Sequence, residues 1–182
     1  MHQILRIDGT RSCALIEFER GQIPLWRHYG ARLPQTPLLT QWSAPAVKRL
    51  PQATMDRMDG IALLPGFGNG FHFSPALRAH QDGRYGIQEL VATGFERHDT
   101  ANHDVLVLIL RDATTDPAAQ LEVRLTLRMH RDSDVLSMDT QLCNLGLRTL
   151  QVDRITSGTL TLGSGLSDVG YFTGQWASEF EW

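Results

Sequence analysis

Three glycines at alternating positions, Gly66 to Gly70, lie in the stretch LLPGFGNGFHFSPAL at residues 63–77. Glycine permits turns that other residues disfavour, and glycine-rich loops can surround phosphate groups. A phosphate loop needs a helix directly after it to present N-terminal amides. The following Phe71–Pro75 has no helix signal. The pattern therefore predicts a turn that positions Phe71 and Phe73 for packing, or a contact with a sugar or a partner subunit.

Histidine and aspartate recur around residues 98–104, where His98-Asp99 and His103-Asp104 bracket a short polar stretch. Their spacing matches no closed zinc site, and no third ligand is evident. We expect a solvated turn before the next strand, and neither a metal nor a cofactor.

Acid–base chemistry is the second possibility that these residue types raise. Asp132 and Asp134 fall in a predicted hairpin turn, where aspartate is favoured for its local hydrogen bonds to the backbone. Asp56 and Asp59 lie in a long loop, and their role stays open. A histidine acid with a glutamate base would suit a sugar mutarotase, but no such pair stands out among the seven histidines. No catalytic residue is predicted.

Tryptophan rings are platforms on which sugars stack, and Trp42 and Trp176 lie in polar surroundings. An ordinary core or interdomain contact is the alternative for each. Trp176, Phe180 and Trp182 close the chain with an apolar surface, which we expect to pack against another domain.

Alternation of apolar and polar residues indicates the elements that position these groups. The alternating run 121–130 is followed by 135–142 and 150–162, with short turns between them. We expect these runs to be three consecutive antiparallel strands. The unbroken apolar run 105–110 (VLVLIL) is typical of a strand buried on both faces.

Further short strands are predicted at 4–7, 14–19 and 24–29, and the best helix candidate is the brief segment 44–50. Many short strands without persuasive helices favour an all-β sandwich. The 182 residues fit one domain, 1–182. The proline-containing stretch 34–58 is its one long irregular connection.

Composition narrows the function classes. The chain has 17 basic and 20 acidic residues, which are intermixed, so no nucleic-acid surface is expected. No apolar run approaches the roughly 20 residues of a membrane span, and no signal peptide is visible. Cys13 and Cys143 are too few for a disulfide framework and are expected to be buried free thiols. We expect a cytoplasmic protein.

Several segments together resemble the N-terminal domain of family 36 glycoside hydrolases, the α-galactosidases. That family has a G-x-G-D-F-R-x-P-A-L loop where this chain has GFGNGFHFSPAL, and a later G-x-W-x-x-E segment where it has GQWASE at 174–179. The strand 25–33, the strand 89–95 and the turn Asn144–Gly146 match other family segments in the same order.

The resemblance implies a β-supersandwich of the galactose-mutarotase type that precedes a (β/α)8 catalytic barrel. The parent enzyme would cleave terminal α-galactosides with retention, using two aspartates of the barrel. The chain would then end about where the barrel begins, and this domain alone would be inactive. It would pack on its own C-terminal barrel, support a homo-oligomer and form part of the rim of the sugar site.

The resemblance also suggests which residues carry these roles. The rim or subunit contact falls on Asp56, Arg57, Asn69, Phe71 and His72. The barrel-docking contact falls on Trp176, Glu179 and Trp182.

One departure from the family bears on specificity, because Phe71-His72-Phe73 replaces the family's Asp-Phe-Arg and removes both charges. Two alternatives stay open, a freestanding carbohydrate-binding module and an aldose mutarotase-like epimerase. The first would use exposed aromatics, and the second would need a histidine and a glutamate in one cleft.

Overall fold

A computed structural model describes the arrangement of residues 2–36, 61–69, 74–81, 84–160, 173–175 and 178–181. The helix candidate 44–50 and most of the irregular stretch 34–58 lie outside these residues. Among the described residues, short 3-10 helices occur at η2 (Phe67–Asn69) and η3 (Pro117–Ala119), and neither is long or apolar enough to cross a membrane. The strands are β1 (His2–Asp8), β2 (Ser12–Glu19), β3 (Leu25–Ala31), β4 (Ile61–Ala62), β5 (Leu77–Gln81), β6 (Arg84–Tyr85), β7 (Leu90–Asp99), β8 (His103–Asp112), β9 (Leu121–His130), β10 (Leu136–Asn144), β11 (Leu150–Ile155), β12 (Thr173–Gln175) and β13 (Ser178–Glu181).

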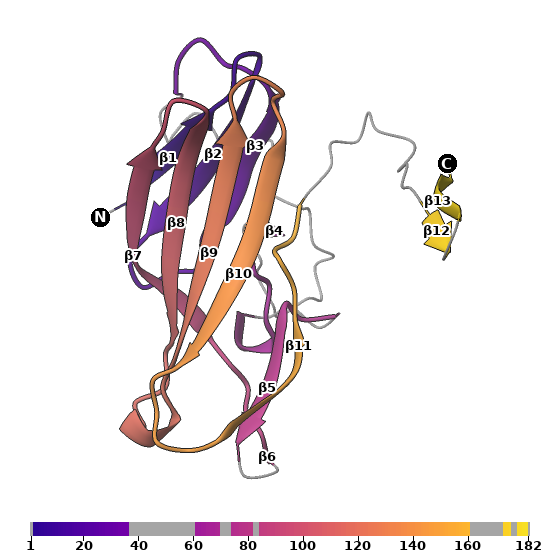
Figure 1. Ribbon diagram of the computed structural model, residues 1–182. Helices are drawn as coiled ribbons and strands as arrows, with labels where there is room; N and C mark the ends of the chain where they lie inside the picture. The colour runs from indigo at the N-terminus through magenta and orange to yellow at the C-terminus, as the bar shows by residue number, and fades with distance from the viewer. Residues whose placement is uncertain are drawn as a thin grey trace, which may run out of the picture.

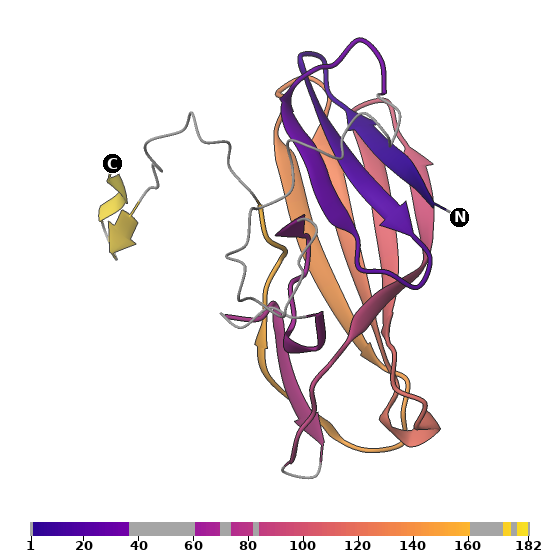
Figure 2. The ribbon, with the colours of Figure 1, turned by 180° about the vertical axis from the view of Figure 1, so that it is seen from behind.

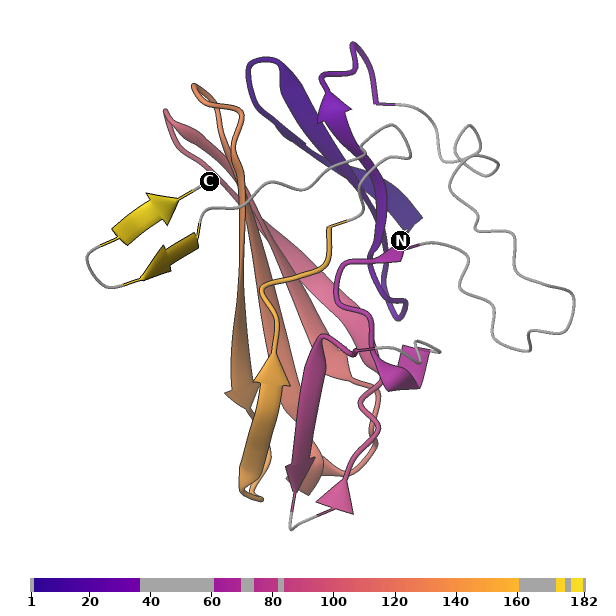
Figure 3. The ribbon, with the colours of Figure 1, turned by 90° about the vertical axis from the view of Figure 1, so that its right-hand side faces the viewer.

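The strands form antiparallel sheets that face one another across an apolar interior. The largest sheet has the order β10-β9-β8-β7. Figure 1 shows its long strands side by side with β1, β2 and β3 behind them, and Figure 2, the view from behind, shows β1, β2 and β3 in front. From the side, the sheet β1-β2-β3-β4 covers one half of the large sheet, while the sheet β11-β5-β6 lies against the other half (Figure 3). The predicted all-β sandwich is therefore confirmed.

Period-two alternation decides which side chains face the interior. On β9 the odd-numbered residues from Leu121 to Met129 are each at most 2% exposed, whereas Glu122, Arg124 and Arg128 point outward and are half-buried. The same alternation on β8 buries Leu106, Leu108 and Leu110. Because successive side chains of a strand point to opposite faces, this pattern was sufficient to predict the inward row of β9. The unbroken apolar run of β8 predicted burial on both faces, whereas Val105 and Ile109 on its outer face are half-buried.

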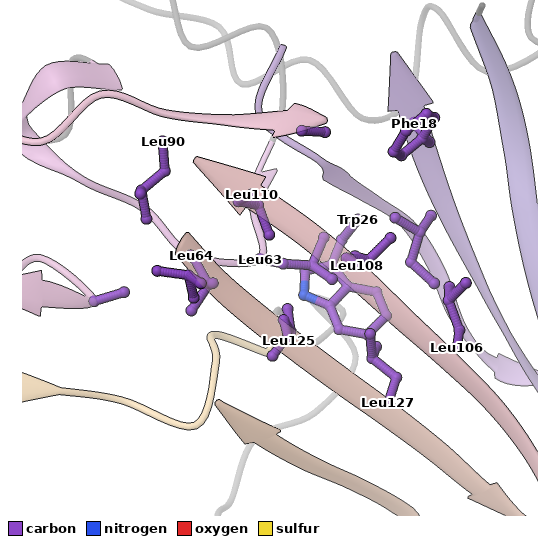
Figure 4. Packing of buried hydrophobic residues seen from close by; sticks show 14 of the residues in the cluster. Phe18, Trp26, Leu63, Leu64, Leu90, Leu106, Leu108, Leu110, Leu125 and Leu127 are labelled. Atoms are coloured by element: carbon purple, nitrogen blue, oxygen red, sulfur yellow. The ribbon is translucent and has the colours of Figure 1, made fainter. Parts of the chain in front are cut away.

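The core is continuous across the layers. Figure 4 shows Trp26 and Phe18 of the first sheet, together with Leu63 and Leu64, packed against the leucines of β8 and β9. Phe18 meets Phe95 of β7 edge to face, with ring centroids 5.2 Å apart. Such contacts join the sheets around a shared apolar core.

The segment 150–162 departs from the prediction in its length and its partner. β11 ends at Ile155 and pairs with β5 of the smaller sheet, not with β10. After β10 the chain is drawn toward η3, because Leu145 N–H donates to the Gln120 carbonyl and Leu147 N–H to that of Ala118. The alternation of apolar and polar residues in one strand does not depend on which strand lies beside it. The sequence therefore predicted a strand here correctly, but the expected partner was wrong.

The cysteines agree only partly with expectation. Both are free thiols; Cys13 is buried and Cys143 is half-buried.

Candidate functional site

The glycine-rich loop is anchored at both ends by backbone hydrogen bonds. Leu63 N–H donates to the Pro24 carbonyl (3.1 Å), and Thr159 N–H donates to the carbonyl of Leu63 (2.8 Å). At the other end Ala76 N–H donates to the Pro65 carbonyl (2.8 Å). These bonds hold the described residues of the loop against β3 and the segment after β11, so its ends are fixed parts of the sandwich.

Gly68 allows the loop to touch the segment before β7. A Cβ atom at Gly68 would lie 2.5 Å from the Gln88 carbonyl oxygen and 2.7 Å from the Glu89 Cα. By contrast, a Cβ at Gly66 would meet nothing closer than 3.4 Å. Of the two described glycines of this loop, Gly68 is therefore the one that a close backbone approach requires.

Asn69 holds the loop to β7. Its Nδ2 donates to the Leu90 carbonyl at 3.3 Å, and its backbone N–H donates to the Gly66 carbonyl at 3.1 Å. Its Oδ1 is buried and accepts no hydrogen bond from the described residues. Asn69 thus has a structural anchoring role, whatever else it contacts.

The other residues predicted for the site are not placed by the structure. Asp56, Arg57, Phe71, His72, Trp176 and Trp182 lie outside the described residues, as does Trp42. Glu179 lies in β13, but the position of its side chain is not described. No two of these predicted residues are therefore brought together among the residues that the structure describes.

A hollow that the sequence did not predict opens between the large sheet and the sheet β11-β5-β6, at the end of the sandwich near η3. Its volume is about 540 Å³. Asp112 continues the inward row of β8, since it follows Leu110 by two positions. Gln81 is paired with Leu150 on the facing sheet. The lining comprises His80, Gln81, Gly86, Ile87, Gln88, Asp112, Thr114, Ala119, Leu121, Arg148 and Leu150. The available signal was an aspartate directly after the buried leucines of the inward row of β8.

The carboxyl group of Asp112 is the unusual group of this hollow. Burial raises its pKa above the usual 3.8, although backbone amides, including that of Glu89 (3.1 Å), partly oppose this shift. Within the described residues no cationic side chain lies within ion-pair distance of it. At the opposite end of the same row, buried Asp104 accepts from Asp8 N–H (2.9 Å) and Arg97 (3.1 Å). Asp104 therefore joins strands, whereas Asp112 lines the hollow.

A smaller hollow of about 230 Å³ lies on the other side of segment 86–88. It is lined mainly by Phe67, Leu77 and Ile87, with Arg78 at its edge. Phe67 and Ile87 are 44% and 72% exposed. The two hollows share Gly86, Ile87 and Gln88, so one short segment forms a wall of each.

The histidines near residue 100 form a hairpin contact. Thr100 N–H donates to the His103 carbonyl (2.9 Å) in the predicted turn, and the His103 Nε2 lies 3.1 Å from His130 Nδ1. Across the described residues no group of three or more metal-ligating side chains comes together. This pair therefore joins β8 to β9 at the turn.

An apolar seam is open where the edge strands β10 and β11 leave the interior uncovered. Val152 and Ile155 pair with the buried Ala79 and Leu77 and so face the interior, yet they are 45% and 40% exposed. Leu160, just after β11, is 40% exposed. Interior-facing side chains of this kind are normally covered, so the seam indicates a surface suited to a partner.

Comparisons with known proteins agree with this architecture. Residues 22–182 match the family model described as the glycosyl hydrolase family 36 N-terminal domain. No curated protein matches the sequence. Similar solved structures include the α-galactosidase from Lactobacillus brevis, with a TM-score of 0.66 at 16% identity, covering 86% of this chain and 23% of that one.

Two further structures are similar to the same extent. The family 36 α-galactosidase AgaA from Geobacillus stearothermophilus has a TM-score of 0.66 at 15% identity. The match covers 86% of this chain and 24% of AgaA. The galactosidase domain of the α-galactosidase–sucrose kinase AgaSK has a TM-score of 0.64 at 16% identity, covering 85% and 24%. These likenesses show the fold, and this chain spans about a quarter of the matched structures. The match over most of the sequence shows that the chain belongs to the glycosyl hydrolase family 36 N-terminal domain family.

Proposed function

We propose that this domain is the non-catalytic N-terminal domain of an α-galactosidase-like glycoside hydrolase. Its role is to pack on the catalytic barrel, to support a homo-oligomer and to form part of the rim of the α-galactoside site. Family membership supports the proposal, as do the α-galactosidases among the structures of similar fold.

Carboxylates on the described strands support a structural role. Hydrolysis with retention needs two carboxyl groups roughly 5 Å apart on either side of the glycosidic bond. On the outer face of the large sheet, Glu122 pairs with Arg111 (2.9 Å), and Arg124 pairs with Glu96. Glu17 of β2 pairs with Arg27 of β3. Each of these acids is therefore paired with an arginine on another strand of its own sheet.

The observation that carries the docking role is the open seam of Val152, Ile155 and Leu160. Burying apolar surface stabilises an interface by about 25 cal/mol per Å² removed from water. Because Val152 and Ile155 already face the interior, covering them extends the core without requiring the sandwich to rearrange. A barrel that follows in the same polypeptide is the partner this proposal assigns to the seam.

The first test is the coding sequence that follows Trp182. We expect a barrel with two aspartates placed for retaining hydrolysis. A stop codon directly after Trp182, with no such barrel, would remove the basis for the hydrolase role.

The second test uses the polypeptide that carries both domains. V152D and I155D should lower its thermal stability and its α-galactosidase activity, because a carboxylate would be buried at the contact. L147D is the matched control, since Leu147 is 94% exposed and lies away from the seam in the β10–β11 connection. Equal effects of all three substitutions would argue against docking at the seam.

The contributions to the sugar rim and to the oligomer need separate experiments. H72A in the two-domain polypeptide should raise KM for an α-galactoside without changing the molar mass measured by light scattering. A change in molar mass alone would assign this loop to the oligomer contact. No change in either quantity would exclude His72 from both roles.

A further inference from the structure

We infer that the hollow at the open end of the sandwich binds a small neutral polyhydroxylated ligand, such as a monosaccharide. None of the residues that line it is among those assigned to the rim contact, and the inference does not depend on the docking role. Its volume of about 540 Å³ lies within the roughly 300–1,000 Å³ of small-molecule sites.

The walls of the hollow are held in place by bonds within the protein. Gln88 Nε2 donates to the Ala79 carbonyl (2.9 Å), which joins the 86–88 segment to β5. Ala113 N–H donates to the Glu89 carbonyl (2.9 Å), which joins the same segment to the end of β8. A site whose walls are already fixed loses less conformational entropy when a ligand binds.

The connection between β10 and β11 also lines the hollow. Its Gly146 lies against η3, where a Cβ atom would be 2.3 Å from the Ala118 carbonyl oxygen. Arg148 pairs with Asp116 at 3.3 Å, and Asp116 Oδ1 accepts from Ala118 N–H at 3.0 Å. Arg148 is therefore held at the hollow with its charge partly balanced.

The polar groups suit hydroxyl groups better than an ion. Asp112 offers an acceptor, and Gln81, whose side chain forms no hydrogen bond with the described residues, offers both a donor and an acceptor. Arg148 offers donors, and its charge is paired with Asp116. A sugar hydroxyl both donates and accepts, so neighbouring hydroxyls can use these groups together.

Apolar residues complete the match. Leu121 and Leu150 line the interior side of the hollow, and Ile87 stands at its edge with 72% of its surface exposed. The C–H faces of a sugar ring can lie on such side chains while its hydroxyls reach the polar wall. The half-buried Asp112 carboxylate accepts from backbone amides but has no cationic partner among the described residues, and a hydroxylated ligand would add hydrogen bonds to it.

The test is an NMR titration of the full chain with galactose, glucose and glycerol. We expect saturable shifts at the amides of Gln81, Ile87 and Thr114, with a Kd on the order of 1 mM for at least one of the sugars. Asp112→Asn should weaken binding about 10-fold, the effect of about 1.4 kcal/mol.

Two exposed positions keep the test independent of folding. Ile87→Trp should block the hollow and abolish binding, whereas Leu147→Trp adds the same ring at an exposed position that does not line it. The inference is overturned if none of the three compounds gives saturable shifts, if Ile87→Trp binds as well as the original chain, or if only an anionic sugar such as galacturonate binds. Absence of a barrel after Trp182 would contradict the hydrolase role and leave this binding unaffected.

Discussion

Asp134 Oδ1 occupies the space that a side chain on Gly9 would need. A Cβ atom at Gly9 would lie 2.2 Å from that oxygen. The same oxygen accepts from Arg11 N–H (2.8 Å) and from Ser12 N–H (2.9 Å). The turn between β9 and β10 is thereby bonded to the turn between β1 and β2, and the two facing sheets are joined at this end.

Gly9→Ala should destabilise the domain. The added methyl group must displace a carboxylate held by several hydrogen bonds, and overpacking of this kind costs about 1–3 kcal/mol. Gly94→Ala is the matched control, because a Cβ at Gly94 would meet no atom within 4 Å. Urea unfolding of both variants measures the difference, and equal midpoints would show that Asp134 moves away without cost.

Asp134→Asn should destabilise the domain at neutral pH, and the effect should disappear in acid. Hydrogen bonds from Arg11 and Ser12 lower the pKa of Asp134 from 3.8 to about 2. A lowered pKa in the folded state means that the ionised carboxylate contributes stability above about pH 4, which is lost as the pH falls through about 2. Asparagine tolerates the backbone φ of 59° at this position, so the comparison isolates the charge.

Thermal unfolding between pH 2 and 7 provides the measurement for Asp134→Asn. Asp132→Asn, in the same turn, serves as the control. A constant difference in Tm across this range would show that the charge of Asp134 is not what stabilises the turn.

Asp112→Asn should have the opposite effect on stability. Burial raises the pKa of Asp112, so its ionised form opposes folding, and this destabilisation appears as the pH rises through the raised pKa. Asparagine keeps an oxygen to accept from Glu89 N–H. We expect a Tm above that of the original chain at pH 7 and a smaller difference near pH 4. A lower Tm at pH 7 would mean that the carboxylate is needed to hold the end of β8.

Gly68→Ala should destabilise the loop more than Gly66→Ala. The new Cβ would press on the backbone of Gln88 and Glu89, which cannot rotate away as a side chain can. We expect a cost of about 2–3 kcal/mol for Gly68→Ala, and much less at Gly66. Hydrogen exchange at Asn69 N–H, together with the unfolding midpoint, would show whether the loop or the whole sandwich is affected. Similar costs at both positions would contradict a specific approach at Gly68.

The predicted strands were confirmed where local alternation sufficed. The inward row of β9 follows from side-chain direction alone, which depends only on neighbouring residues. The family resemblance added the fold type, because the loop, the strands and the closing segment occur in the family's order.

The predicted turn at Asp132 and Asp134 was correct, but the hydrogen bonds of the Asp134 carboxylate are not local. They reach Arg11 and Ser12, more than 120 residues away in the chain. No spacing of residues within the turn could indicate that partner.

The same distinction between local sequence patterns and contacts of distant residues holds in the rest of the molecule. Alternation and turn residues are properties of neighbouring positions, so the sequence was enough to predict strands, turns and an all-β class. The pairing of β11 with β5, the open seam at Val152 and Ile155, and the hollow around Asp112 depend on which distant strands meet. The packing of the whole sandwich decides which distant strands lie together, and only the tertiary structure shows it.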